Sequence, residues 1–205
     1  THPSASTPLA KLVMTDAVDL EIPAEPLQGH AQYLFASEGG RGIHVIDVRD
    51  PTAPKRAAFV PSIQPRGMAL AGDWLYSADG IGGLRIYDVS KPAQIRQVGH
   101  LPTFDAHEVV VQWPYAYVAD GPGGLLIVDV RAPIAPRAVG GFPTTDPDER
   151  DAAVDVSVLF QYSRPLELHD RPSNDRTPAR NLAAVLDENA GMVLVDVTGP
   201  SRPVK

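Results

Sequence analysis

Tyr115-Ala116-Tyr117-Val118-Ala119-Asp120-Gly121-Pro122-Gly123-Gly124-Leu125-Leu126-Ile127-Val128-Asp129-Val130 is the stretch of sequence that decides the fold. It consists of two apolar runs around a short segment rich in glycine, a pattern typical of a β-hairpin. The glycines supply the positive φ angles of a tight turn, and the aspartate before them can accept bonds from nearby backbone N–H groups. Because both runs are apolar almost throughout, we expect strands that are buried on both faces.

The end of this stretch recurs with a fixed period. Two apolar residues followed by Asp-Val occur four times, with the aspartates at Asp47, Asp88, Asp129 and Asp196. These aspartates are separated by 41, 41 and 67 residues, and the last spacing is one period plus an insertion of 26 residues. Three residues after each Asp-Val pair comes a proline, at Pro51, Pro92, Pro133 and Pro200. A period of this length indicates a repeat architecture.

Each period contains four short apolar segments, here called A to D in chain order. In the three regular copies the hairpin of segments B and C covers residues 33–48, 74–89 and 115–130, and in the fourth copy it covers 182–197. Segment A lies at 68–70, 109–111 and 154–156, and segment D at 56–60, 96–99 and 137–140. No stretch shows helical periodicity. Four strands in about forty residues predict an all-β fold, a β-propeller of four-stranded blades.

The chain reads as one propeller domain, or a segment of one, over residues 1–205. Residues 1–30 resemble D and A segments, 31–142 hold three regular repeats, and 143–205 hold a fourth repeat with an insertion at about 159–181. The chain stops where a fourth D strand should begin. In one interpretation the repeats belong to a larger ring, which we favour because forty-residue blades usually close in larger rings. In the other, an N-terminal D-type strand completes the fourth blade and closes a ring of four.

The strings Tyr-Val-Ala-Asp-Gly, Gly-Gly-Leu and Ile-Val-Asp-Val, with a trailing Pro-x-x-Pro, resemble the LVIVD repeat. The resemblance is close over residues 31–142 and is interrupted by the insertion over 150–205. It implies a β-propeller and an extracytoplasmic location, which is periplasmic, on the cell surface or secreted. It implies no particular reaction.

Composition excludes several classes of function. The formal net charge of −7 disfavours nucleic acid and anionic membrane surfaces as partners. The absence of cysteine excludes disulfides, cysteine-based zinc sites, thiol catalysis and covalently attached haem. No apolar run is long enough to cross a bilayer, so we expect no direct membrane insertion. We expect no cofactor and no metal.

One position combines residues that could do chemistry. His107 and Glu108 open segment A of the third repeat, and the period aligns them with Arg66 and Gly67 in the second. Inner strands begin at the mouth of the central channel of a propeller, where His107, Glu108 and Arg66 could bind an anion, hold a metal or transfer protons. The simpler interpretation is a polar channel lining. The repeated aspartates are interpreted as acceptors for turn N–H groups, because a single site cannot need all four.

The insertion is the segment that breaks the repeat, and it replaces a short A–B turn. A long polar loop on a rigid scaffold is a common place for contacts with a partner. It is equally consistent with a solvated loop of no specific role. The candidate partner-binding residues are Arg164, His169, Asp170, Arg171 and Arg176. His169-Asp170 lacks further ligands at the spacing of a metal site.

The sequence therefore favours a non-catalytic extracytoplasmic propeller that acts as a scaffold for protein–protein interaction or assembly. The first alternative is a propeller hydrolase, for example a lactonase-like enzyme, with its site at the channel mouth. The second is an accessory propeller of a multihaem redox protein whose haem-binding part lies outside this sequence. No serine-elbow, phosphate-loop or zinc-protease motif is present.

Overall fold

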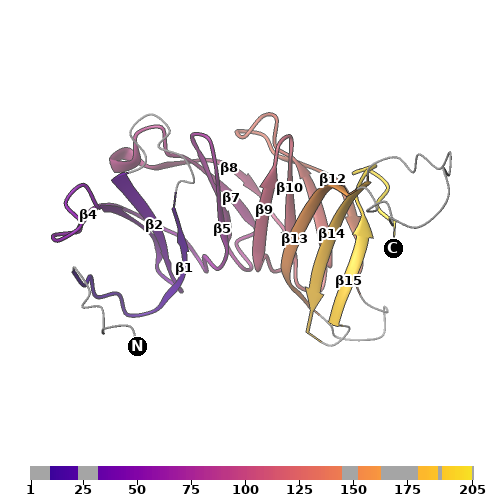
Figure 1. The fold of residues 1–205 in the computed structure, drawn as a ribbon, viewed down its shortest axis with the longest axis horizontal. Coiled ribbons are helices and arrows are strands. Elements are labelled where there is room, and N and C mark those ends of the chain that lie inside the picture. The colour runs from indigo at the N-terminus through magenta and orange to yellow at the C-terminus, as the bar shows by residue number, and fades with distance from the viewer. Residues whose placement is uncertain (1–9, 23–31, 145–151, 163–179, 189–190, 205) are drawn as a thin grey trace, which may run out of the picture.

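The structure, a computed structural model, describes residues 10–22, 32–144, 152–162, 180–188 and 191–204, which form four antiparallel sheets (Figure 1). Each sheet follows the chain order of its strands and is called a blade. Blade 1 holds β1 (Ala17–Glu21), β2 (Tyr33–Glu38), β3 (Gly42–Asp47) and β4 (Lys55–Pro61), and blade 2 holds β5 (Met68–Ala71), β6 (Trp74–Ala78), β7 (Leu84–Asp88) and β8 (Arg96–Leu101), with the 3-10 helix η2 (Pro92–Gln94) before β8. Blade 3 holds β9 (Glu108–Gln112), β10 (Tyr115–Ala119), β11 (Leu125–Asp129) and β12 (Arg137–Phe142), and blade 4 holds β13 (Ala153–Tyr162), β14 (Arg180–Asp187) and β15 (Gly191–Asp196).

The predicted hairpins form with one register in every blade. Tyr33 pairs with Asp47, Trp74 with Asp88, and Tyr115 with Asp129, so in blades 1 to 3 each B strand begins opposite the aspartate that ends its C strand. In blade 4 the equivalent pair is Leu182 and Asp196. In blades 2 and 3 the turn glycines Gly80 and Gly121 adopt φ angles of 54° and 50°. A side chain at either position would be strained, because only glycine adopts such angles readily. The turn chemistry read from the sequence therefore sets the hairpin geometry.

Apolar side chains are buried between neighbouring blades rather than within one. Phe35 of blade 1 packs with Leu75 and Tyr87 of blade 2, and Ile86 of blade 2 packs with Val118 of blade 3. A third cluster joins blade 3 to blade 4 and includes Tyr117, Leu125, Ile127, Val185 and Val195. In blades 2 and 3, which have a neighbour on each side, both faces of the B and C strands are therefore buried, which is why their sequences are apolar without alternation.

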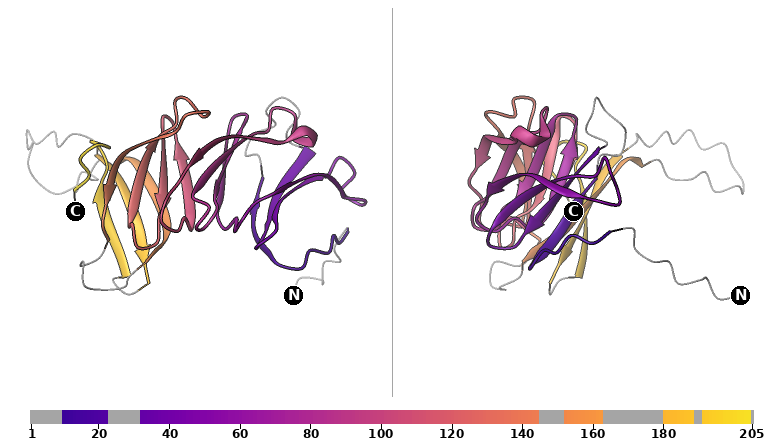
Figure 2. Two further views of the ribbon diagram at one scale, coloured as in Figure 1. Left: turned by 180° about the vertical axis from the view of Figure 1, so that it is seen from behind. Right: turned by 90° about the vertical axis from the view of Figure 1, so that its left-hand side faces the viewer.

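The four blades form an open arc. Figure 1 places blade 1 and blade 4 at opposite ends of the long axis, and the two further views in Figure 2 agree. The sheets are thus of the β-propeller type but do not close, so the interpretation as a closed ring of four blades is wrong. The A strands lie on one side of the arc, where β5 packs against β9 and β9 against β13.

Three segments outside the regular repeats can be compared with their prediction. The A strand expected at 16–20 is β1, whereas residues 10–14 form no strand, so the D-type strand expected there is absent from the described N-terminal residues. The insertion lies between β13 and β14 as predicted, but strand pairing extends into it as far as Tyr162 and Arg180. Val204 forms a bridge with Asp196, in the register in which Arg137 of blade 3 pairs with Asp129.

Candidate functional site

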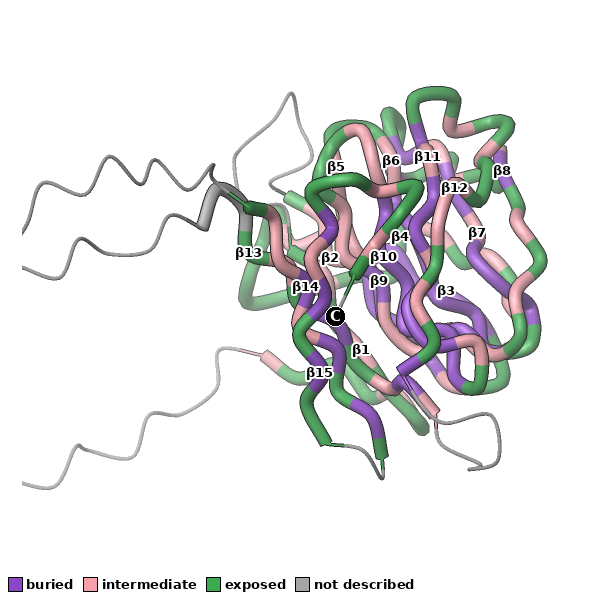
Figure 3. The backbone as a smooth tube through the Cα atoms, turned by 90° about the vertical axis from the view of Figure 1, so that its right-hand side faces the viewer, coloured by how far each residue is buried: buried purple, intermediate pink, exposed green. Residues whose placement is uncertain are grey.

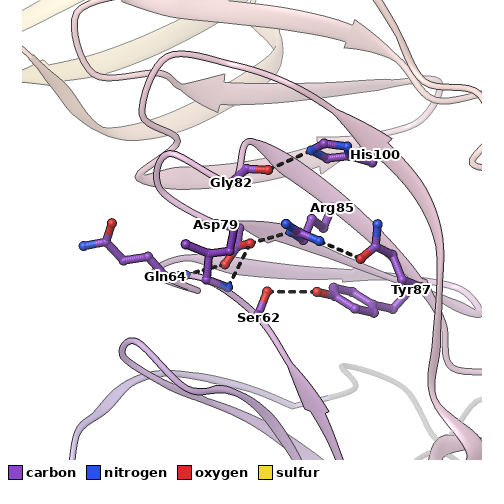
Figure 4. Close-up of polar contacts among 9 residues, drawn as sticks. Ser62, Gln64, Asp79, Gly82, Arg85, Tyr87 and His100 are labelled. Atoms are coloured by element: carbon purple, nitrogen blue, oxygen red, sulfur yellow. Dashed lines mark hydrogen bonds and ion pairs between the residues drawn. The ribbon is translucent and has the colours of Figure 1, made fainter.

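A buried carboxylate holds the turns at one end of each blade. In blade 2 this is Asp79, which is fully buried and accepts bonds from the backbone N–H of Ile63 at 3.2 Å and of Gln64 at 2.7 Å. The guanidinium of Arg85 also donates to Asp79 (Figure 4). The carboxylate therefore ties the B–C hairpin to the connection between the D strand of blade 1 and the A strand of blade 2.

The equivalent carboxylates do the same in the other blades. Asp120 of blade 3 accepts from the N–H groups of Phe104 and Asp105 at 3.1 and 3.0 Å. In blades 1 and 4 the partners are hydroxyl groups, since Thr15 donates to Glu38 and Thr144 donates to Asp187. The bonds from Thr15 and His44 hold the pKa of Glu38 at about 2. The expectation that the aspartate before the turn glycines accepts bonds from backbone N–H groups is confirmed for Asp120 and for its counterpart Asp79.

The aspartates of the Asp-Val motif also hold turns. Asp47, Asp88, Asp129 and Asp196 each accept a bond from the backbone N–H two residues later, at 3.0, 3.0, 3.0 and 2.9 Å. Bonds to the charged form of a carboxylate lower its pKa. In Asp129 the side chain and backbone of Arg131 lower it to about 2. The predicted structural role of this motif is therefore confirmed.

The candidate site lies on the surface that these turns form. We call this surface the turn face; it consists of residues 63–66, 79–83, 104–107 and 120–124 of blades 2 and 3. Arg66 and His107 lie on it, and Asp105 contacts both of them. Their place at the mouth of a central channel stays a prediction, because the described sheets form an open arc. The Asp105 carboxylate is 3.1 Å from Nη1 of Arg66 and 3.0 Å from Nε2 of His107. All three side chains are partly exposed.

Asp105 was missed in the sequence analysis because the period gives it no acidic counterpart. It aligns with Gln64 in blade 2, and its partner Arg66 lies in the neighbouring repeat. The feature of the sequence that could have identified Asp105 is its position two residues before His107. The resulting ion pair crosses from the start of blade 2 to the start of blade 3, so it links the two blades as well as marking a polar site.

Glu108 lies directly beside this cluster. The backbone N–H of Gly67 donates to the carbonyl of His107 at 2.9 Å. The carboxylate of Glu108 covers the Cα of Gly67 so closely that a Cβ there would lie 2.4 Å from Oε1. Burial raises the pKa of Glu108 to about 7, and the negative charges of Asp19, Asp155 and Glu21 add to the effect.

Acidic side chains of β1 in blade 1 accept hydrogen bonds from the backbone of β5, the edge strand of blade 2. Asp19 accepts a bond from the N–H of Met68 at 2.7 Å, and Glu21 accepts one from the N–H of Leu70 at 3.0 Å. Burial raises the pKa of Glu21 above its usual value. At the first strand of blade 2, two N–H groups are thus paired by carboxylates of the preceding blade.

Replacing Glu108 with glutamine should stabilise the protein at pH 8 but not at pH 4. Because the pKa of Glu108 is raised from 4.5 to about 7 in the folded state, its ionisation costs stability progressively between these pH values. After allowance for solvent screening at this partly exposed group, we expect a gain of about 1–2 kcal/mol at pH 8. Urea unfolding of both proteins from pH 4 to 8 measures it. The exposed Glu188→Gln variant is the control, and parallel pH profiles for Glu108→Gln and the parent would contradict the prediction.

The remaining candidate residues cannot be placed. Arg164, His169, Asp170, Arg171 and Arg176, predicted to bind a partner, lie outside the described residues. Within the described ranges, no three histidine or acidic side chains are grouped as a metal ion would require. The same ranges contain no helix with the length and apolarity needed to cross a membrane.

Comparison with known families identifies the repeat. Residues 65–103 and 105–144 each match the model of the LVIVD repeat, and these ranges correspond to blades 2 and 3. The predicted resemblance is thereby confirmed, and the turn face lies largely on these two LVIVD repeats. No curated protein matches the sequence.

Solved structures are similar in fold. Sqt1 of Saccharomyces cerevisiae aligns with a TM-score of 0.53 and 9% identity over 78% of this chain and 42% of its own. The computationally designed protein Ika4 aligns with a TM-score of 0.52 and 8% identity over 82% of this chain and 93% of its own. Hydrazine synthase of Kuenenia stuttgartiensis aligns with a TM-score of 0.44 and 13% identity over 96% of this chain and 68% of its own. At these identities the comparison concerns the fold, and the chain spans less than half of Sqt1.

Proposed function

We propose that the protein is a non-catalytic, extracytoplasmic propeller that binds a protein partner through its turn face. The observation that carries this proposal is a group of large apolar side chains exposed on that face. Phe104 is 73% exposed and directly precedes Asp105 of the Arg66–Asp105–His107 cluster. Ile81 is 72% exposed and follows Gly80, which forms a strand bridge with Ala106. Exposed apolar groups bordered by charged ones are typical of protein-binding surfaces.

The apolar side chains are presented on a rigid backbone. The N–H groups of Ile63 and Phe104 are fixed by the buried carboxylates Asp79 and Asp120. The ring of Phe104 lies over Gly123, where an added Cβ would be 2.9 Å from Cδ2. A surface that is ordered before binding loses less entropy on association. This support for a binding role comes from the same turns that build the blades.

Replacing Phe104 with alanine should abolish most of the partner affinity. A central aromatic side chain at an interface contributes about 2 kcal/mol, which corresponds to a roughly thirtyfold increase in Kd. Proteins captured from an extract of the source organism by the parent and by Phe104→Ala are compared by quantitative mass spectrometry. The Kd of each purified candidate is then measured by calorimetry.

Trp113→Ala is the matched control. Trp113 is an aromatic residue that is also mostly exposed, but it lies in the A–B turn at the opposite end of blade 3. A partner that binds the parent and Trp113→Ala equally but is lost from Phe104→Ala supports the proposal. A partner whose affinity does not change in Phe104→Ala, or the absence of any captured protein, contradicts it.

One observation favours the hydrolase as a second candidate. The pKa of Glu108 near 7 is the value that a general acid–base catalyst needs at neutral pH, and His107 and Arg66 lie beside it. Assay of the purified chain against lactones and esters distinguishes the candidates. Turnover that is present in the parent and lost in Glu108→Gln would support the enzyme, and its absence from the parent would exclude it.

A further inference from the structure

A small pocket lies between blades 2 and 3, at the edge of the turn face. We call it the Asp120 pocket; it has a volume of about 320 Å³, and its lining includes Thr103, Phe104, Asp120, Leu126 and Ala138. Figure 3 shows the largely buried β11, which carries Leu126, beside the more exposed β12, which carries Ala138. The volume is at the lower end of the range of about 300–1,000 Å³ that is usual for ligand pockets.

In blade 2 the equivalent place is filled by long polar side chains. Arg85 stands where blade 3 has Leu126, one period later in the chain. Its guanidinium donates to the buried carboxylate of Asp79 (Figure 4) and, at 2.8 Å, to the side chain of Gln97. Blade 3 has Ala138 in the place of Gln97. Two long polar side chains are thus replaced by shorter apolar ones, which explains why blade 3 has an apolar pocket here.

The buried carboxylate of blade 3 lacks the cationic partner that its counterparts have. In blade 2 this partner is Arg85, and in blade 1 the guanidinium of Arg41 lies 3.4 Å from the carboxylate of Glu38. Asp120 is 3% exposed, yet within the residues that the structure describes it accepts bonds from backbone N–H groups alone. Buried charges in proteins are usually paired. The chemistry that would complete this site is therefore a cation on a long apolar stem, which is what blade 2 supplies itself.

A second polar group of the pocket has no partner either. Oγ1 of Thr103 is buried and makes no hydrogen bond among the described residues. Its counterpart Thr144 donates to the buried Asp187 of blade 4 at 2.6 Å, so in that blade the hydroxyl is used. A buried polar atom without a partner costs free energy, and a hydroxyl oxygen can accept a bond from an incoming donor. The pocket thus combines a carboxylate and a hydroxyl with an apolar wall.

We propose that the Asp120 pocket receives an arginine side chain of the protein partner. The guanidinium takes the place that Arg85 has in blade 2, pairs with Asp120 and donates to Thr103, and the aliphatic stem packs on Leu126 and Phe104. Arginine suits such a site because its planar group carries several donors and pairs well in buried surroundings. The formal net charge of −7 also favours a basic partner. This inference rests on the proposed function, since it names the side chain that the turn face recognises.

An arginine peptide tests the pocket without knowledge of the partner. The acetylated and amidated peptide Gly-Ser-Arg-Ser-Gly is titrated into the isotope-labelled chain, and NMR follows the N–H groups of Phe104 and Asp105, which donate to Asp120. The matched peptide with citrulline in place of arginine keeps the shape but has no charge. It should bind about tenfold more weakly or worse, because bonds to a charged group are the stronger ones. Equal affinity for both peptides, or no saturable shift with the arginine peptide, overturns the proposal.

Replacing Leu126 with arginine supplies the cation from within the chain. The new side chain should pair with Asp120 as Arg85 pairs with its carboxylate in blade 2. Binding of the arginine peptide should then be lost, and the Kd for the partner should rise about thirtyfold, with unchanged circular dichroism. Ile134→Arg is the control, because it adds the same charge at an exposed position at the opposite end of blade 3 and should bind like the parent. A Leu126→Arg variant that binds the arginine peptide as well as the parent overturns the proposal.

The inference and the proposed function fail in different ways. A partner that is lost from Phe104→Ala but is retained by Leu126→Arg supports the turn face as the binding surface and overturns the arginine pocket. An arginine peptide that binds at Asp120 while no protein is captured supports the preference of the pocket for arginine and contradicts the proposed function.

Discussion

Replacing Gly140 with alanine should lower the free energy of unfolding by about 3 kcal/mol, because the new methyl group has no space. A Cβ at Gly140 would lie 1.9 Å from the carbonyl oxygen of Pro200 and 3.0 Å from its carbon. These are backbone atoms of the turn that follows β15, so the clash cannot be relieved by rotating a side chain. Blade 3 and blade 4 would have to move apart along their shared apolar cluster.

Urea unfolding measures this effect, with Gly199→Ala as the matched control. An added Cβ at Gly199 meets no atom within 4 Å, so that variant should unfold within about 0.5 kcal/mol of the parent. Gly99 repeats the arrangement one junction earlier, where a Cβ would lie 2.0 Å from the carbonyl oxygen of Pro133. Gly99→Ala should therefore cost about as much as Gly140→Ala. Equal midpoints for Gly140→Ala and Gly199→Ala would show that the two blades do not meet at this glycine.

The repeat allowed most of the fold to be predicted from the sequence. A period of 41 residues fixes where each hairpin lies, because Asp47, Asp88 and Asp129 occupy the same register position in three blades. Of the two strands predicted near the N-terminus, β1 forms, whereas residues 10–14 do not take part in a D-type strand. Leu12 and Val13 have the apolar character of a strand, but a strand also needs a partner edge, which sequence similarity does not reveal.

The candidate site was only partly predictable. The period aligns the start of blade 2 with the start of blade 3, so it identified Arg66 and His107 as equivalent positions. It could not identify Asp105, which differs from its counterpart Gln64 and acts across the junction of two blades. The same holds for Asp19, whose bond to the N–H of Met68 depends on how closely successive A strands approach. Contacts between repeats depend on the angle between blades, which the repeat itself does not encode.

Replacing Asp79 with alanine should destabilise the protein by about 3–4 kcal/mol. Asp79 is fully buried and accepts from two backbone N–H groups and from the guanidinium of Arg85. Removing one partner of a buried ion pair leaves a charge without compensation, which costs far more than the pair contributes. The N–H groups of Ile63 and Gln64 would lose their acceptor at the same time. Asp79→Asn keeps the shape and one acceptor oxygen, so its loss should be intermediate.

Asp50→Ala is the control for this prediction, because Asp50 holds an exposed turn by accepting from Thr52. Its loss should cost much less stability than the loss of Asp79, because Asp50 is exposed to solvent. The two variants also differ in their effect on the turn face. Since Asp79 fixes the backbone of Ile63, Asp79→Ala should raise the Kd for a turn-face partner, whereas Asp50→Ala should leave it unchanged. If both variants lose equal stability, the carboxylate of Asp79 is not what holds the hairpin to the connection between blades 1 and 2.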